Sequence, residues 1–125
     1  MKIISTNKAP AAVGPYSQAI EVNGFVFCSG QIGIDPKTGE LVEGIEKQIR
    51  QVMENLQAVL DRSGSHLNQV VKTTVFIKNM ADYSIFNQIY GEYFKNHKPA
   101  RATVEVSNLP KGALVEIEII AVLKV

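Results

Sequence analysis

The sequence has a single cysteine, two histidines and no tryptophan. Cys28, within the apolar stretch FVFC, excludes an internal disulfide bond and is interpreted as a small core residue rather than a nucleophile. Two histidines leave little for a metal centre. No stretch concentrates lysine and arginine, and 13 basic and 12 acidic residues give a net charge of +1. The chain therefore lacks the electrostatic footprint expected of a nucleic-acid binder.

Long hydrophobic runs are also absent. The first ten residues, MKIISTNKAP, lack the apolar stretch of a signal peptide, and no later segment approaches the length of a membrane span. We therefore expect a metal-free protein of the cytoplasm. The 125 residues contain no repeat, low-complexity tract or linker, so we expect one domain over residues 1–125.

Hydrophobic periodicity predicts two helices. Apolar residues recur at helical spacing in residues 43–64 and again in residues 81–96. Gly64 is placed to end the first helix and Asp82 to cap the second. Gly91, inside the second helix, costs about 1 kcal/mol relative to alanine, which indicates close packing at that position.

Strands are predicted before, between and after these helices. Residues 17–33 carry two apolar runs around Asn23–Gly24, a hairpin signal, and IDPKTGE follows as a turn. VVKTTVFIK is β-branched and aromatic. Residues 99–120, PARATVEVSNLPKGALVEIEII, read as two strands around a turn. The order strand-strand-helix-strand-helix-strand-strand predicts a two-layer α+β fold with both helices on one face of a mixed sheet.

The two faces of the last strand differ in character. Alternation assigns one face to Val115, Ile117, Ile119, Ala121, Leu123 and Val125, and the other to Glu116, Glu118, Ile120, Val122 and Lys124. The second face begins polar and then becomes apolar. An apolar pair on that face suits a subunit interface, so we expect a homo-oligomer; a loop folded over the face is the alternative.

Two charged residues stand near the starts of the last two strands. Arg101 has the shape to hold a carboxylate through two parallel hydrogen bonds, although a solvated arginine or a surface ion pair explains it as well. Glu116 becomes a general acid or base if a partly apolar pocket raises its pKa, and is otherwise a solvated carboxylate. The sequence does not determine the register that decides whether the two meet.

Weaker candidates lie at strand ends and on the second helix. The stretch SGQIG contains Ser29, Gly30 and Gln31, where glycine lets a ligand approach the backbone. A tight turn is the ordinary explanation. Tyr16 lies on a loop, where it either packs against the hairpin or binds a ligand. Asn87 lies near the apolar side of its helix, where exposed asparagine is also common.

Five segments together resemble one known family: NKAPAAVGPYSQAI, CSGQIGIDPKTGE, VVKTTVFIKNMADY, NQIYGEYF and KPARATVEVSNLPKGALVEIEIIAV. They closely resemble the Rid family, also known as the YjgF or reactive-intermediate deaminase family, from about Asn7 to Val122. The likeness is closest to the RidA branch, whose members carry the arginine found here as Arg101. It implies a chorismate-mutase-like α+β fold that assembles as a homotrimer, with active sites between subunits.

The resemblance also implies an activity. RidA proteins hydrolyse enamine and imine intermediates, such as 2-aminoacrylate and 2-aminocrotonate, which pyridoxal-phosphate-dependent dehydratases release. The products are 2-oxo acids and ammonia, and other pyridoxal-phosphate enzymes are thereby protected. No metal or cofactor is expected, because an imine carbon is already electrophilic.

Roles are carried over position by position. Arg101 would hold the substrate carboxylate, Glu116 would activate the attacking water, and the backbone carbonyl of Thr103 would orient that water or the departing nitrogen. The remaining cleft residues implied by the resemblance are Tyr16, Ser29, Gly30, Gln31 and Asn87.

Two positions depart from the pattern of the family. Bacterial relatives often have cysteine at Thr103 and proline at Gly33. The first change is tolerable if only the carbonyl acts, and the second is expected to loosen the loop after Gln31 and alter the substrate range. An endoribonuclease or translation inhibitor, and a non-catalytic trimer that binds small acids, stay open as alternatives.

Overall fold

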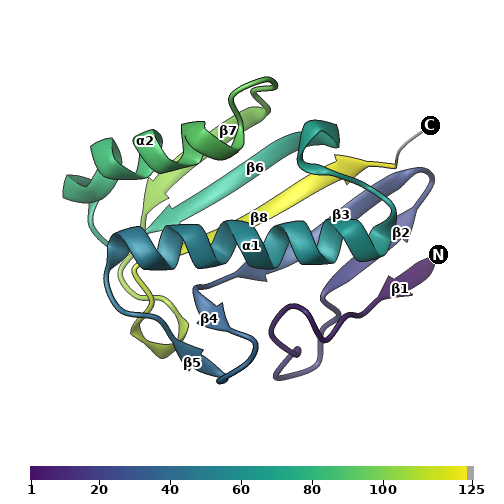
Figure 1. The fold of residues 1–125 in the computed structure, drawn as a ribbon, viewed down its shortest axis with the longest axis horizontal. Coiled ribbons are helices and arrows are strands. Elements are labelled where there is room, and N and C mark those ends of the chain that lie inside the picture. The colour runs from purple at the N-terminus through teal and green to yellow at the C-terminus, as the bar shows by residue number, and fades with distance from the viewer. Residues whose placement is uncertain (124–125) are drawn as a thin grey trace.

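The centre of the molecule is a six-stranded mixed sheet in the order β1-β2-β3-β8-β6-β7. The computed structural model describes residues 1–123, so the predicted positions of Lys124 and Val125 on the two faces of the last strand lie outside the described residues. Both helices lie on one face of the sheet (Figure 1). The predicted two-layer α+β architecture is therefore confirmed.

The strands run antiparallel from β1 to β6, and β7 alone is parallel to its neighbour, β6. The turn between β2 and β3 has positive φ at both Asn23 (52°) and Gly24 (81°), which matches the predicted hairpin. The bounds are β1 (Lys2–Ile4), β2 (Ala19–Val22), β3 (Phe25–Gln31), β6 (Val70–Ile77), β7 (Ala100–Glu105) and β8 (Val115–Val122), with a separate small hairpin of β4 (Ile34–Asp35) and β5 (Glu40–Leu41).

Both predicted helices are present, as α1 (Ile45–Ser63) and α2 (Tyr83–Tyr93). Gly64 ends α1 in the left-handed conformation, as expected. Asp82 occupies the N-cap position of α2, but its side chain makes no capping hydrogen bond. The prediction of close packing at Gly91 is wrong within this chain, because a Cβ built there meets no atom within 4 Å.

The core fills the space between the helices and the sheet. Its largest fully buried side chains include Phe86 of α2 and Ile49, Met53 and Leu56 of α1. Cys28 is buried, as predicted, and this burial raises the pKa of its thiol to about 12. Neither helix among residues 1–123 is long and apolar enough to cross a membrane. The cytoplasmic location stays a prediction.

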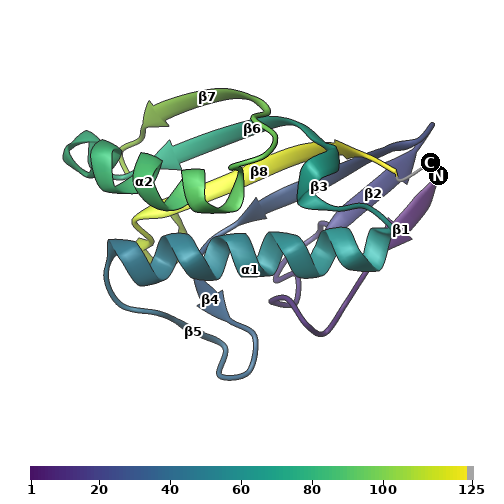
Figure 2. The same ribbon diagram turned by 45° about the horizontal axis from the view of Figure 1, so that its top comes forward.

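Residues 99–120 do not form the predicted hairpin. Figure 2 shows β6 lying between β7 and β8, and β7 pairs only with β6. The reason is the chain path, because α2 carries the chain from β6 to a parallel strand at the sheet edge. The connection over residues 106–114 is longer than the usual hairpin loop of about two to five residues, so it can pass across β6.

The sheet face opposite the helices stays open. Phe25, Phe27 and Val104 on this face are 41%, 43% and 45% exposed, and Ile120 and Val122 beside them are half-buried. No described segment folds over these side chains, which excludes the loop considered as an alternative. The open face keeps the apolar character that led us to expect an oligomer.

Candidate functional site

Glu116 is half-buried on the central strand β8 and points to the open face of the sheet. It is paired across β8 and β6 with Phe76, whereas its neighbours Val115 and Ile117 are buried under the helices. The carboxylate lines a cavity of about 290 Å³, here called the Glu116 cavity. Its other lining residues are Pro10, Ala11, Val13, Tyr16, Gln18, Gly30, Gln31, Ile32, Ile34, Pro110 and Lys111.

The environment of Glu116 favours its protonated form. Burial raises the pKa of this carboxyl above its ordinary value, and the negative charge of Glu118 adds to the effect. A carboxylate with a raised pKa accepts a proton more readily than an ordinary surface glutamate. A general base needs this property, and Glu116 has it to a greater degree than an exposed glutamate.

Gly30 provides the space that the carboxylate occupies. A Cβ built on Gly30 would overlap Oε2 of Glu116 and lie 2.9 Å from its Cδ. The pairing of β3 with β8 is irregular between Cys28 and Gln31, and such a bulge changes the direction of the side chains around it. The glycine predicted to admit a ligand thus admits the Glu116 side chain itself.

Ser29 has a structural partner beside this cavity. Its hydroxyl donates to the carbonyl of Ser17 at 2.6 Å, and its N–H donates to the carbonyl of Gln18 at 2.9 Å. These bonds hold the loop before β2 against β3. Tyr16, at the end of that loop, is 51% exposed and lines the Glu116 cavity.

A buried amide holds the N-terminal wall of the Glu116 cavity. The Nε2 of Gln18 donates to the carbonyls of Thr6 (3.0 Å) and Pro10 (2.8 Å), and its Oε1 accepts from the N–H of Thr6 (2.7 Å). The loop over residues 6–10 has no regular secondary structure of its own. One side chain therefore satisfies backbone groups at both ends of this loop.

A second buried amide, Asn55 of α1, holds the opposite wall. Its Nδ2 donates to the carbonyls of Ile32 (3.2 Å) and Ile34 (3.0 Å). Between them, the carbonyl of Gly33 accepts from the N–H of Val42 at 2.9 Å. The loop after Gln31 is thus tied down rather than loosened at the glycine. An altered substrate range stays a prediction.

Arg101 lies on the edge strand β7 and points toward α2. Its partner on β6 is Thr73, a helix-facing residue whose hydroxyl is hydrogen-bonded to that of Tyr90 at 2.8 Å. The Cζ atom of Arg101 lies 4.9 Å from the ring centroid of Tyr90 and 5.6 Å from that of Phe86. These distances are within the range of cation–π attraction.

A second, more apolar cavity of about 270 Å³ adjoins Arg101 and is here called the Arg101 cavity. Asn87, one helical turn from Gly91, lines it, and its role as a substrate-binding residue stays a prediction. The missing side chain of Gly91 leaves this cavity open toward solvent. The full lining is Asn87, Tyr90, Gly91, Phe94, Lys98, Pro99 and Arg101.

Thr103 lies two residues after Arg101 on the same face of β7. Its Oγ1 is buried and has no hydrogen-bond partner among the described residues. The N–H of Val106 donates to Ile77 of β6, and backbone groups alternate in direction along a strand, so the carbonyl of Thr103 points to the unpaired outer edge. That carbonyl is free to bind a group from outside the chain.

Within one chain the two cavities do not form one site. β6 separates β7 from β8, and Arg101 is level with Ile119, three residues from Glu116. Strand spacing and rise then put the two Cα atoms about 14 Å apart. The side chains also point to opposite faces of the sheet. One chain thus gathers Tyr16, Gly30 and Gln31 around Glu116, and leaves Arg101 with Asn87 elsewhere.

Sequence reasoning missed four residues that line or support these cavities or contact Arg101: Gln18, Asn55, Tyr83 and Lys111. Gln18 is a polar residue next to the start of an apolar strand, and this pattern could have marked it. Tyr83 precedes Asn87 and Tyr90 by four and seven residues, the spacing of one helix face. Lys111 lines the Glu116 cavity with a positive φ of 58°, and no sequence signal marks that conformation for a lysine.

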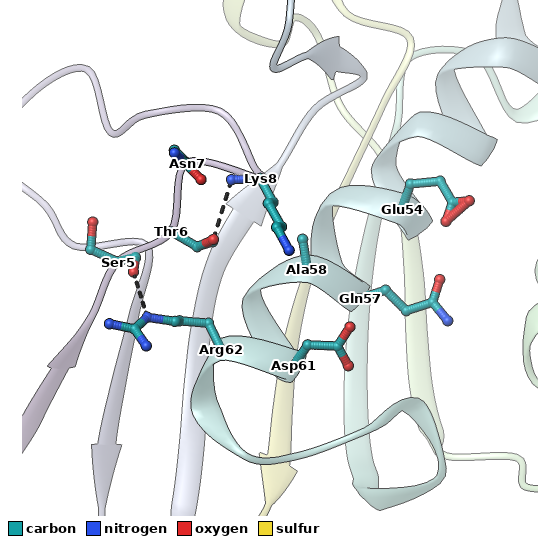
Figure 3. A pocket seen from close by; sticks show the side chains of 9 residues that line it. All are labelled: Ser5, Thr6, Asn7, Lys8, Glu54, Gln57, Ala58, Asp61 and Arg62. Atoms are coloured by element: carbon teal, nitrogen blue, oxygen red, sulfur yellow. Dashed lines mark hydrogen bonds between the residues drawn. The ribbon is translucent and has the colours of Figure 1, made fainter.

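A further cavity, of about 700 Å³, is lined by none of the predicted residues. Figure 3 shows it between residues 5–8 and α1, where Arg62 donates from Nε to the carbonyl of Ser5 at 3.1 Å and the Lys8 side chain extends toward Ala58. Its charged side chains carry both signs and are exposed. Among residues 1–123 no group of three or more His, Cys, Asp or Glu side chains is arranged to hold a metal ion.

Comparisons with known proteins agree on one family. A family model described as "Endoribonuclease L-PSP" matches residues 6–123. A mouse protein named 2-iminobutanoate/2-iminopropanoate deaminase is 49% identical over 122 residues, which cover 97% of this chain and 90% of the mouse protein. The crystal structure of YyfA from Yersinia pestis, a protein of unknown function of the conserved Rid family, is 57% identical with a TM-score of 0.96 and covers 98% of both chains. Escherichia coli TdcF with bound serine is 39% identical with a TM-score of 0.95, over 99% of this chain and 100% of that one.

Proposed function

Because the chain belongs to the endoribonuclease L-PSP family, which includes the Rid proteins, we propose that it is a 2-iminobutanoate/2-iminopropanoate deaminase. It converts small 2-imino acids and their enamine forms to 2-oxo acids and ammonia, and so protects pyridoxal-phosphate enzymes. The mouse relative carries this name at 49% identity. The observation that supports it most is that a guanidinium and a carboxylate of raised pKa each line a cavity of suitable size.

The active unit is a homotrimer of chains of residues 1–125, in which the Arg101 cavity of one subunit faces the Glu116 cavity of the next. Three features support this arrangement. The two side chains point to opposite faces of one sheet, the open face exposes Phe25, Phe27 and Val104, and the outer edge of β7 is unpaired. A ring of three such heterologous contacts closes on itself and completes three sites.

Substrate binding uses charge and orientation. Arg101 holds the carboxylate of the substrate through paired hydrogen bonds, with Asn87 beside it. The backbone N–H groups near Gly30 and the ring of Tyr16 form the opposite wall of the substrate site. Ser29 and Gln31 support that wall. Fixing the carboxylate sets the imine carbon against the water on Glu116, and orientation alone supplies much of the rate of such reactions.

The chemical step needs one base and no cofactor. Glu116 takes a proton from water as the oxygen bonds to the carbon of the protonated imine, and the electron pair of the double bond moves to nitrogen. Glu116 then returns the proton to nitrogen, the C–N bond breaks to release ammonia, and the hydroxyl gives its proton to Glu116 to leave the 2-oxo acid. Glu116 passes that proton to ammonia or to water, which restores the base. The carbonyl of Thr103 orients the water or the departing nitrogen.

A coupled assay tests the activity. A threonine dehydratase generates the imine, and semicarbazide traps whatever survives. Added protein should shorten the lifetime of the intermediate, and Arg101→Ala should abolish this effect. An unchanged lifetime with the native protein would reject the deaminase.

Mixing two inactive variants tests the shared site. Subunits with Arg101→Ala retain Glu116, and subunits with Glu116→Gln retain Arg101. In trimers co-assembled from equal amounts of the two, about one interface in four combines both intact residues, because each interface draws one subunit from each side at random. We expect about a quarter of the native activity. Full inactivity of mixed trimers, with native sedimentation, would contradict a site built from two subunits.

The family description favours endoribonuclease activity as a second candidate. The net charge of +1 and the absence of a basic stretch give little support for RNA binding. A steep loss of activity with added salt would favour RNA cleavage over imine hydrolysis. A comparison of the parent with Glu116→Gln distinguishes a purely binding trimer. Turnover in the parent, with binding but no turnover in Glu116→Gln, supports the enzyme, whereas binding without turnover in both proteins supports the binding trimer.

A further inference from the structure

We propose that Tyr83 is a positioning residue for Arg101, which holds the guanidinium in one orientation and leaves its remaining N–H groups free for a carboxylate. The inference rests on the proposed function of Arg101 as the carboxylate ligand. It adds a residue that neither the sequence patterns nor the comparisons pointed to. It also assigns a role to the aromatic face of α2.

The contact is direct and involves both parts of the tyrosine. The Nη2 of Arg101 donates to the hydroxyl of Tyr83 at 3.1 Å, and the Cζ of Arg101 lies 5.7 Å from the centroid of the Tyr83 ring. Phe86 and Tyr90 follow at spacings of three and four residues, so the three rings lie on one face of α2. The guanidinium lies against this face, and its position is determined by contacts with all three rings.

The hydroxyl determines how the guanidinium is rotated. Ring contacts restrict the plane of the group but not its rotation within that plane. One hydrogen bond to a fixed acceptor removes that freedom and uses only one of the five N–H donors of arginine. The other donors keep the paired geometry that a carboxylate needs. Ordering the side chain before the ligand arrives increases affinity, because less flexibility is lost on binding.

The environment of the hydroxyl agrees with this role. The pKa of Tyr83 lies below its ordinary value, because the Asn87 side chain and then the charge and hydrogen bond of Arg101 favour the phenolate. Asn87 is four residues away on the same helix face. Tyr83 thus lies beside two residues of the Arg101 cavity, Asn87 and Arg101.

The main test removes the hydroxyl and keeps the ring. We compare Tyr83→Phe with Tyr93→Phe, a matched control on the same helix whose hydroxyl lies beside Arg50 instead of Arg101. Calorimetry gives the Kd of 2-oxobutanoate and of its neutral amide, and the coupled assay gives kcat and KM. Loss of one hydrogen bond predicts an increase in Kd and KM of about three- to tenfold for the carboxylate in Tyr83→Phe, with kcat within about twofold. The amide should bind all three proteins alike.

A second measurement guards against a purely structural effect. In protein labelled with ¹³C at the tyrosine Cζ, adding 2-oxobutanoate should raise the pKa values of Tyr83 and Tyr90, because the carboxylate neutralises the charge of Arg101, which lowers both. The Tyr83 response should be missing in Tyr83→Phe and both responses should be present in Tyr93→Phe. A general loosening of α2 would affect both variants and would not remove the response of Tyr83 alone.

The outcomes separate this inference from the proposed function. Equal Kd and KM in both variants would overturn the role of Tyr83 and leave the deaminase intact. A weaker 2-oxobutanoate complex in Tyr83→Phe alone, together with a parent that does not hydrolyse imines, would support the role of Tyr83 and reject the deaminase. A parent that binds no 2-oxo acid at all would overturn both.

Discussion

Replacing Gly30 with alanine tests how closely the backbone and the carboxylate of Glu116 are matched. The added Cβ would lie 2.9 Å from Cδ of Glu116, whereas ordinary contacts begin near 3.4 Å. Because Oε2 overlaps the added Cβ and lies closer to it than Cδ does, the carboxyl group must retreat by about 1 Å or rotate away. It can do so cheaply, since it is the end of a flexible side chain and the φ of Gly30 is not positive.

The expected effect falls on activity rather than on stability. A displacement of this size in a reacting group lowers kcat by about 10- to 100-fold. The free energy of unfolding should stay within about 1 kcal/mol of the parent, because alanine also restricts the unfolded chain. Urea unfolding and the coupled imine assay measure the two quantities on the same preparation.

The pH profile gives an independent check. If Glu116 acts as the base, the rate falls as the pH drops through its raised pKa. In Gly30→Ala the carboxyl group of Glu116 moves toward water, so its pKa returns toward the ordinary value. The fall in rate on the acid side of the pH profile then shifts to lower pH. This account of the contact would be refuted if Gly30→Ala kept the native kcat and the native fall in rate at acid pH while Glu116→Gln was inactive.

Three further predictions concern stability and loop order. Leu56→Ala should lower the free energy of unfolding by about 2–5 kcal/mol, measured in urea, because Leu56 is fully buried between α1 and the sheet. Glu116→Gln should raise Tm at pH 7, since a carboxyl whose pKa is raised by folding destabilises the native state once it ionises; the gain should vanish below the ordinary pKa of 4.5, where Glu116 is protonated in both states. Gln18→Ala should cost about 2–3 kcal/mol because it leaves buried loop groups such as the carbonyl of Pro10 unpaired, and hydrogen exchange should rise over residues 6–10.

Much of the fold could be predicted from local patterns. α1 has a continuous apolar stripe and a terminal glycine, and both features act within the segment itself. The turn at Asn23–Gly24 likewise depends on two residues that tolerate positive φ. The alternation in β8 predicted its buried face because the strand is half-buried along its whole length.

Strand order was not accessible in the same way. Residues 99–120 satisfied the pattern of a hairpin, but pairing depends on which strand already occupies the neighbouring position. β6 is long and apolar and pairs on both edges, so it takes the place beside β8 and moves β7 to the edge. No local pattern in residues 99–120 shows which strand will pair with β8.

The candidate site was predictable in its residue types and not in its assembly. The chemistry of Arg101 and Glu116 follows from their side chains, whereas their location on opposite faces follows from the global topology. The contacts that support the site were even harder to predict from the sequence. The amides of Gln18 and Asn55 act on backbone groups distant in sequence, and a single sequence does not show such pairs.

The opposite directions of Arg101 and Glu116 have a practical consequence for handling the protein. In the proposed trimer a solitary subunit would keep its fold and yet turn over nothing, because its Arg101 and Glu116 point to opposite faces of the sheet. Under strong dilution the rate per milligram would then decline while circular dichroism stays constant. Enzyme units would serve as a gauge of how many subunits have found their neighbours.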